Sequence, residues 1–256
     1  MPNRSIIIGD VHGCSGELTS LLKELDPKGD DHVYFIGDLI DKGPDSIGVI
    51  NLVADLREKC IVSFVIGNHE EKFLRYVKHK MSGSHAHEQM KNTEEFDVLL
   101  SKIDEIQLSV LNNSFYTIYL DELDLLLLHA GIPGNVNFNL KASIPYSEDA
   151  KKKFKNVGLL LMTRMLDESG SFVGLDDNSG SYFWAEKYNK KFGKVVFGHE
   201  AFIQNKAKQF PNAIGIDTGC VYGGWLTAMI IDENQNQNVS YISQKALAKY
   251  CEYGRK

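Results

Sequence analysis

Near its N-terminus the chain reads Ser5-Ile6-Ile7-Ile8-Gly9-Asp10-Val11-His12-Gly13, an aliphatic run that stops at a glycine and is followed at once by two polar side chains. A short, continuous apolar run of this kind is typical of a strand buried on both faces. Asp10 and His12 are two positions apart, so their side chains share a face if the segment is extended. The stretch therefore predicts a buried strand that presents a carboxylate and an imidazole at its carboxyl end.

The same arrangement recurs along the chain. Apolar runs at residues 33–36, 61–66, 125–128 and 195–197 end at a glycine or a short turn, and they deliver Asp38, Asn68, His129 and His199. In α/β folds, functional residues cluster at the carboxyl ends of strands. Each of these residues alone is explained as a cap, a turn former or a satisfied polar group. Five such placements together indicate one shared site.

The polar residues that follow these runs match the preferences of a metal ion. Carboxylate, amide and imidazole groups together suit borderline divalent metals such as Mn, Fe or Zn. Two metals about 3.5–4 Å apart need a bridging carboxylate, and hydroxide held between them is a nucleophile near neutral pH. Asp38 is the candidate bridge. The predicted metal ligands are Asp10, His12, Asp38, Asn68, His129 and His199.

Helical patterns follow several of the predicted strands, which indicates a layered α/β fold. Apolar residues recur at helical spacing in residues 16–25, 45–56 and 70–78. We expect one domain over residues 1–256, with helical insertions near 81–113 and 147–177. The tail at 225–243 alternates in polarity around an Asn-rich stretch, 234–238, and predicts a hairpin.

Composition narrows the class of partner. The chain has 256 residues, 28 basic and 34 acidic, with a formal charge of −6 and 43% hydrophobic residues. This mild acidity argues against a nucleic-acid coat or an anionic membrane surface as the main partner. The four cysteines form no CxxC pair, so we expect reduced thiols in a cytoplasmic protein. No apolar run approaches the length of a membrane span.

The motifs resemble those of a known family. In order and spacing, the motifs at residues 9–13, 37–43, 67–70, 129–131 and 198–199 resemble those of the calcineurin-like metallophosphoesterases. The nearest branch contains the bacterial-type serine/threonine protein phosphatases and the symmetrical diadenosine tetraphosphatases. The resemblance covers about residues 5–231. It implies a β-sandwich of two mixed sheets flanked by helices, with two divalent ions, most often Mn, at its edge.

The resemblance also implies a role for each residue. Asp10, His12 and Asp38 would hold the first metal, and Asp38, Asn68, His129 and His199 the second. His69 would protonate the leaving oxygen and Asp41 would orient it, which suits an imidazole held charged by a carboxylate. Arg164 matches the arginine that clamps the phosphate, since a planar fork suits phosphate oxygens. The alternative for Arg164 is a surface or capping arginine.

Three positions depart from the family pattern or leave alternatives open. Lys42 stands where the family usually has arginine, so the positive charge is kept but bidentate geometry is lost. Glu200 stands where Thr or Trp usually follows the last histidine. Tyr222 could contact substrate or be a packed aromatic residue.

The resemblance leaves the substrate open. The first reading is a metal-dependent phosphomonoesterase acting on phosphoproteins or small phosphoesters, which the presence of Asp41 favours. The alternative is a dinucleoside polyphosphate hydrolase that breaks an anhydride with the same residues. A metal-binding protein without strong catalysis is disfavoured, because His69 and Asp41 are both present. The insertions would decide between the substrates.

Overall fold

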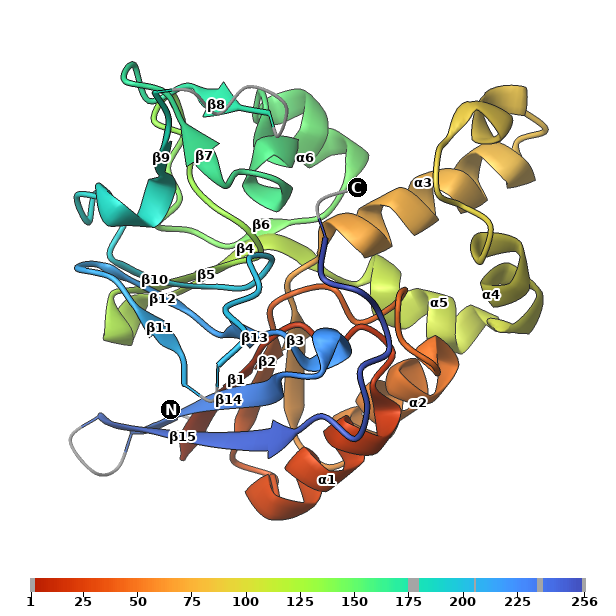
Figure 1. Ribbon diagram of the computed structural model, residues 1–256, viewed down its shortest axis with the longest axis horizontal. Coiled ribbons are helices and arrows are strands. Elements are labelled where there is room, and N and C mark those ends of the chain that lie inside the picture. Colours follow the sequence, from red (N-terminus) through yellow and green to blue (C-terminus); the bar gives the residue numbers. More distant parts are fainter. Residues whose placement is uncertain (1–2, 175–179, 205, 234–236, 255–256) are drawn as a thin grey trace.

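Two six-stranded sheets form the centre of the protein in the computed structural model, which describes residues 3–174, 180–204, 206–233 and 237–254 (Figure 1). The first sheet has the order β13-β14-β1-β2-β3, with β15 paired to β14. Its strands are β1 (Arg4–Ile8), β2 (His32–Phe35), β3 (Ile61–Phe64), β13 (Asp217–Thr218), β14 (Trp225–Asp232) and β15 (Asn238–Lys245).

The second sheet has the order β11-β12-β10-β5-β4-β6. Its strands are β4 (Phe115–Leu120), β5 (Leu125–Leu128), β6 (Ile144–Pro145), β10 (Lys194–Phe197), β11 (Lys208–Gln209) and β12 (Ala213–Gly215). In the first sheet the parallel strands β1, β2 and β3 run to one edge, and the antiparallel strands lie beside β1. In the second sheet the parallel strands β5, β10 and β12 are central, and antiparallel strands lie on both sides of them. Both sheets are therefore mixed, as predicted.

Central strands such as β1, β5 and β10 are buried on both faces, and their alternation separates two apolar clusters. Ile7 belongs to a cluster with Leu127 and Val196 from the other sheet. Its neighbours Ile6 and Ile8 belong to a larger cluster with residues of the covering helices, such as Leu18 and Leu21. Because successive side chains of a strand point to opposite faces, the first cluster fills the space between the sheets and the second lies under the helices.

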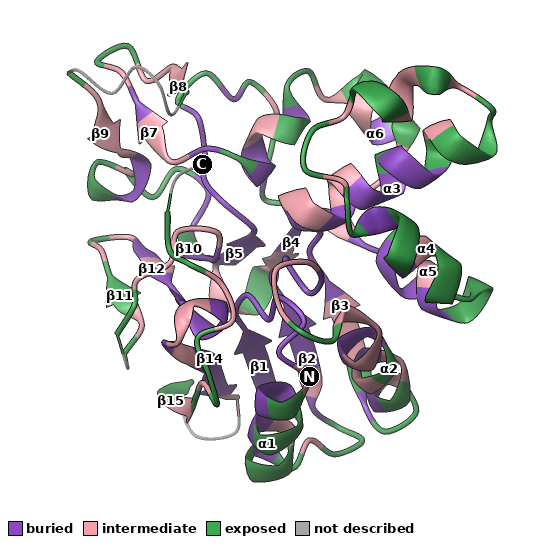
Figure 2. Cartoon of the chain, turned by 45° about the vertical axis from the view of Figure 1, so that its right-hand side comes forward, coloured by how far each residue is buried: buried purple, intermediate pink, exposed green. Residues whose placement is uncertain are grey.

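Helices α1 (Ser15–Leu25), α2 (Ser46–Arg57) and α3 (Asn68–Met81) follow the first three strands, as the helical patterns predict. Figure 2 shows that α1 and α2 turn a buried face toward the first sheet and an exposed face outward. Asp45 caps α2 by accepting a hydrogen bond from the Gly48 N–H. The loops that enter α1 and α2 carry Asp10, His12 and Asp38, and α3 begins with Asn68. His129 and His199 follow β5 and β10 of the second sheet.

The first insertion is helical, as expected, and the second is helical only in its first half. The first contains η1 (His85–Gln89), α4 (Phe96–Lys102) and α5 (Glu105–Asn112). The second begins with α6 (Glu148–Lys153) and η3 (Val157–Leu161). It then turns into a small sheet of β7 (Met165–Leu166), β8 (Phe172–Val173) and β9 (Tyr182–Phe183). Residues 175–177 of this predicted insertion lie outside the described residues.

The second insertion changes to strands for a local reason. The Asp167 carboxylate accepts hydrogen bonds from the N–H groups of Ser169 and Ser171. This side chain–backbone bonding closes a turn in place of a further helical turn, and it sets β7 antiparallel to β8.

The C-terminal hairpin is confirmed, since β14 pairs antiparallel with β15 over eight residues. Residues 234–236 of its predicted Asn-rich turn lie outside the described residues. No helix within the described ranges is both long and apolar enough to cross a membrane.

Candidate active site

The predicted ligands meet where the carboxyl ends of the two sets of parallel strands face each other. Two glycines explain how the loops come so close. A methyl group on Gly198 would overlap the Asp10 carboxylate, and one on Gly67 would overlap the Asp38 carboxylate. Glycine at these positions therefore lets a neighbouring strand end approach each carboxylate directly.

The backbone at this edge is held in an uncommon conformation. Among the described residues, five site residues other than glycine have a positive φ: His12 (46°), Asp38 (48°), Asp41 (72°), Lys42 (66°) and His199 (65°). Such conformations cost free energy in non-glycine residues and persist where the surroundings over-determine them, as they do in active sites.

Asp38 lies between two histidine groups. Its Oδ2 atom is 3.4 Å from His12 Nε2, and its Oδ1 atom is 3.5 Å from His129 Nε2. His199 completes the second group, whose ligand atoms lie within 4.8 Å of one another. One carboxylate thus offers a separate oxygen to each group, which is the arrangement that a bridging ligand requires.

Two of the histidines have a defined tautomer. His12 Nδ1 lies 3.1 Å from the Ile40 carbonyl oxygen, and His129 Nδ1 lies 2.9 Å from that of Ile36. A carbonyl oxygen only accepts, so each Nδ1 carries the proton and each Nε2 keeps its lone pair. Metal-ligating histidines are commonly oriented by such a second hydrogen bond.

Two buried atoms at the centre lack a hydrogen-bond partner among the described residues: Asp10 Oδ1 and His199 Nε2. Asp10 Oδ2 accepts a hydrogen bond from the His199 N–H at 2.9 Å. Buried polar atoms without a partner are costly unless an ion or water satisfies them. Both atoms are good metal donors, so the site fits a divalent cation.

The electrostatics of the cluster also suit a cation. Burial lowers the pKa values of His12, His129 and His199, so these imidazoles are neutral and able to coordinate at neutral pH. Burial opposes ionisation of Asp38, but attraction to the imidazoles of His129, His69 and His12, when these are protonated at low pH, holds its pKa well below the usual value. Burial and the charges of Asp217 and Asp38 raise the pKa of Asp10, a repulsion that a bound cation would relieve.

His69 and Asp41 form a close pair. His69 Nδ1 lies 2.6 Å from Asp41 Oδ2, and His69 Nε2 lies 3.8 Å from Asp38 Oδ2. On this side, the ligand atoms that lie within 4.8 Å of one another are those of His12, Asp38 and His69. Asp10 Oδ2 accepts the His199 N–H, and the place of Asp10 in the first ligand group stays a prediction.

Asn68 faces the second group. Its Oδ1 atom lies 3.0 Å from His129 Nε2, and His129 is fully buried. Because Asn68 is the first residue of α3, its placement follows from the turn at Gly67 and not from an additional loop.

Lys42 and Tyr222 line the same cavity as His69, with a volume of about 620 Å³. Lys42 Nζ is 3.0 Å from His12 Nε2 and 5.5 Å from the centre of the Tyr222 ring. Burial would lower the pKa of Lys42, but the charges of Asp38 and Tyr222 raise it. Lys42 is therefore a cation at the edge of the cluster.

Tyr222 lines the cavity, where it could contact substrate, and it also packs edge-on against Tyr253 as a packed aromatic residue would.

Arg164 reaches the cavity, but a carboxylate already holds it. Its Nε atom donates to Glu200 Oε2 at 2.7 Å, and its Nη2 atom donates to the His199 carbonyl oxygen at 3.1 Å. The departure at Glu200 thus has a structural role, because this residue fixes the guanidinium beside the second histidine group. The other N–H groups of the guanidinium remain for a ligand.

The sequence did not identify Glu70 and Asp217 as residues of the site. Glu70 is fully buried and accepts hydrogen bonds from the N–H groups of Asp38, Ile40 and Gly67, each at 3.0 Å. It therefore ties two strand ends together. The available signal is its place in the motif at residues 67–70, at the start of a helix. Asp217 is a buried residue of β13, and burial raises its pKa to about 6.

Comparison with known proteins agrees with this geometry. Residues 4–201 match the family model described as calcineurin-like phosphoesterase. A bis(5'-nucleosyl)-tetraphosphatase PrpE [asymmetrical] of Anoxybacillus flavithermus is 31% identical, with 93% of this chain and 96% of the relative covered. The symmetrical bis(5'-nucleosyl)-tetraphosphatase of Stutzerimonas stutzeri is 25% identical over 89% of this chain and 94% of the relative.

Solved structures agree as well. The crystal structure of a putative diadenosine tetraphosphatase superposes with a TM-score of 0.68 at 27% identity and covers 95% of this chain and 96% of that one. A serine/threonine phosphatase from Saccharomyces cerevisiae gives 0.58 at 15% identity, with 97% and 82% covered, and shows the fold alone.

Proposed function

The chain belongs to the calcineurin-like phosphoesterase family, whose members use a dimetal centre, and from this premise we propose that it is a two-metal hydrolase of dinucleoside polyphosphates. That it hydrolyses phosphoester or phosphoanhydride bonds follows from the family itself. The proposal of two metal ions rests on the position of Asp38, which presents one oxygen to His12 and the other to His129.

The proposed ligands are those predicted from the sequence. Asp10, His12 and Asp38 would hold one ion, and Asp38, Asn68, His129 and His199 would hold the other. The unpartnered atoms Asp10 Oδ1 and His199 Nε2 support this assignment. When bound, two divalent ions neutralise phosphoryl oxygens and supply a nucleophile at neutral pH. The donor set suits Mn, with Fe and Zn as alternatives.

The remaining residues act on the substrate. Arg164 and Lys42 bind phosphoryl oxygens as fixed cations, and Asn68 and Tyr222 contact the same group. His69 donates a proton from Nε2 to the leaving oxygen, because its Nδ1 is bonded to Asp41. Asp41 holds the ring in that orientation.

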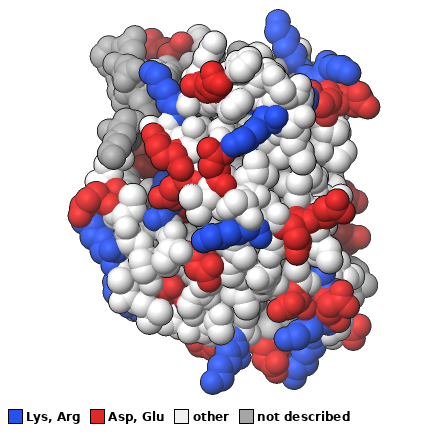
Figure 3. Space-filling model, turned by 90° about the vertical axis from the view of Figure 1, so that its right-hand side faces the viewer, with Lys and Arg blue, Asp and Glu red and all other residues white. Residues whose placement is uncertain are grey.

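The dinucleoside substrate is supported by the relatives. The relatives at 28–31% identity carry the asymmetrical tetraphosphatase name, so we propose that diadenosine tetraphosphate is split into a triphosphate and a monophosphate. On the face with α3, α4 and α5, basic and acidic side chains are interspersed, without a continuous basic band (Figure 3). This suits a compact nucleotide better than a long polyanion. A cytoplasmic location is part of the proposal, and the four free cysteines fit it.

A second candidate is the phosphomonoesterase reading, and the His69–Asp41 pair favours it. An alkyl phosphate has a poor leaving group that needs a proton in the transition state, whereas a leaving nucleotide phosphate is a weak base. A general acid as well placed as His69 is therefore most useful for a monoester.

A substrate panel on Mn-loaded protein decides between these candidates. Diadenosine tetraphosphate, a phosphoserine peptide and para-nitrophenyl phosphate are ranked by kcat/KM, and the nucleotide products are separated by chromatography. We expect diadenosine tetraphosphate to rank first and to yield ATP and AMP. A phosphopeptide that ranks first by tenfold or more would replace this proposal with the second candidate.

A further inference from the structure

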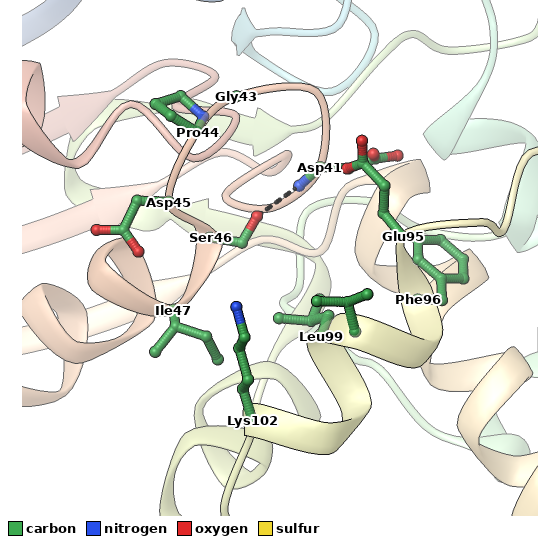
Figure 4. A pocket seen from close by; sticks show the side chains of 11 residues that line it. Asp41, Gly43, Pro44, Asp45, Ser46, Ile47, Glu95, Phe96, Leu99 and Lys102 are labelled. Atoms are coloured by element: carbon green, nitrogen blue, oxygen red, sulfur yellow. Dashed lines mark hydrogen bonds between the residues drawn. The ribbon is translucent and has the colours of Figure 1, made fainter.

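We propose that a pocket beside Asp41 binds the nucleoside of the leaving half of the substrate, an inference that rests on the proposed function. The pocket has a volume of about 580 Å³, within the range of small-molecule sites. It lies between the start of α2 and helix α4. Figure 4 shows Ile47 on one side of it and Leu99 and Lys102 on the other.

The pocket adjoins the catalytic cavity. Asp41, Glu95 and Phe96 line both spaces and form their common border. The Asp41 N–H donates to Ser46 Oγ at 3.0 Å, which fixes the residue between them. The same Asp41 carboxylate holds His69.

The position of His69 decides which half of the substrate enters the pocket. A general acid must lie next to the oxygen that leaves with the departing group. His69 is bonded to Asp41, and Asp41 is a wall of the pocket. The leaving group therefore extends over Asp41 toward α2 and α4, away from the His129 and His199 side.

The chemistry of the walls selects a neutral ligand with hydrogen-bond donors. Ile47, Val98 and Leu99 offer apolar contact to a flat base. The Glu95 carboxylate is an acceptor that suits a ribose hydroxyl or an exocyclic amine, as carboxylates do in other nucleotide sites. The Asp45 oxygens already accept hydrogen bonds from Ser15 Oγ and the Gly48 N–H. Three lining carboxylates against one lysine, Lys102, repel phosphate, so the phosphate chain stays beside Lys42 and Arg164.

The test fills the pocket without touching the metal ligands. Ile47→Trp places an indole where the nucleoside would lie. Val98→Trp does so from the other wall, at a position that is 54% exposed and tolerant of change. Ile106→Trp is the matched control, since it adds the same group to neighbouring α5, where Ile106 is 70% exposed and does not line the pocket. Thermal unfolding verifies that each variant is folded.

We expect both pocket variants to raise KM for diadenosine tetraphosphate at least tenfold and to leave kcat/KM for para-nitrophenyl phosphate within twofold. Ile106→Trp should change neither. Unchanged KM values in folded Ile47→Trp and Val98→Trp would overturn the pocket assignment alone. A loss confined to a phosphopeptide would assign the pocket to peptide. Wild-type protein that hydrolyses para-nitrophenyl phosphate but not diadenosine tetraphosphate would refute the proposed function and this inference with it.

Discussion

The strand-end loops and the insertion at residues 82–113 face each other across the catalytic cavity, yet they are built on different principles. On the strand-end side, Asp10, Asp38 and His129 are buried. Backbone carbonyl oxygens orient the rings of His12 and His129, and Glu70 accepts the Asp38 N–H. On the insertion side, short helices expose large apolar side chains such as Val98 and Ile106. The first region can hold atoms in one geometry, whereas the second tolerates substitution. We infer that reaction chemistry resides in the first and substrate choice in the second.

The largest expected effect is on the strand-end side. Asp38→Asn removes the shared charge and should lower kcat/KM by roughly 10³-fold or more, because metal ions supply several kcal/mol of charge stabilisation. Metal content, measured by elemental analysis, should fall with it. Asp26→Asn is the control, since Asp26 is an exposed C-cap with positive φ that asparagine tolerates. Full metal content with normal activity in Asp38→Asn would show that Asp38 does not bridge two metal ions.

The next effect separates chemistry from binding within the same region. His69→Asn should cost roughly 10²–10⁴ in kcat for an alkyl phosphate, the usual range for general acid catalysis. The loss should be smaller for para-nitrophenyl phosphate, whose leaving group departs largely unprotonated. Both rates are compared at matched metal occupancy. An equal loss for the two substrates would mean that His69 serves phosphate binding or site structure.

A smaller effect is expected at Arg164, which lines the cavity that the two regions share. Arg164→Lys keeps the charge but loses the planar fork that Glu200 and the His199 carbonyl hold. Hydrogen bonds to charged groups are worth about 1.5–3 kcal/mol, so kcat/KM should fall roughly 10- to 100-fold. Arg75→Lys on the exposed side of α3 is the control and should have no effect. A fully active Arg164→Lys would show that a point charge is sufficient.

The smallest effect concerns stability at the amino end of β2, the strand whose carboxyl end leads to Asp38. Burial lowers the pKa of His32 to about 4, from about 6.5 in an unfolded chain. Between these values the unfolded state binds the extra proton, so the folded state loses stability as the pH falls from about 6.5 to about 4. Allowing for partial exposure, the loss is about 1–2 kcal/mol.

Denaturant unfolding of wild-type protein and of His32→Gln at pH 7 and pH 4.5 measures this contribution. The variant should lose less stability than wild type over this interval. His85→Gln is the control, because His85 is exposed and should leave the wild-type pH dependence unchanged. The same pH dependence in all three proteins would show that His32 does not carry this proton linkage.

The two regions also differ in how far the sequence predicts them. The buried strands could be predicted because each apolar run is continuous and ends at a glycine and a polar residue, as in residues 5–13. Strand β4 was missed, although Phe115–Leu120 is rich in aromatic and β-branched residues. The role of Glu70 in joining two strand ends was missed as well. Its N–H donors come from strand ends brought together only by the fold.

The second insertion shows the limit most clearly. Its first half is helical, but a carboxylate–backbone turn at Asp167 replaces the expected second half with strands. Such a turn competes locally with helix formation, and helical spacing does not reveal it. The contact between Arg164 and Glu200 likewise joins residues 36 positions apart, so only the folded chain shows why Glu200 is present.

The central claim is that Asp38 joins two metal ions on which the hydrolysis depends. Metal-depleted protein is titrated with Mn²⁺, and hydrolysis of diadenosine tetraphosphate is followed together with the number of ions bound per chain. We expect no hydrolysis without metal, and a rate of hydrolysis that reaches its plateau when two ions are bound per chain. Full activity with one ion per chain, or with none, would contradict it.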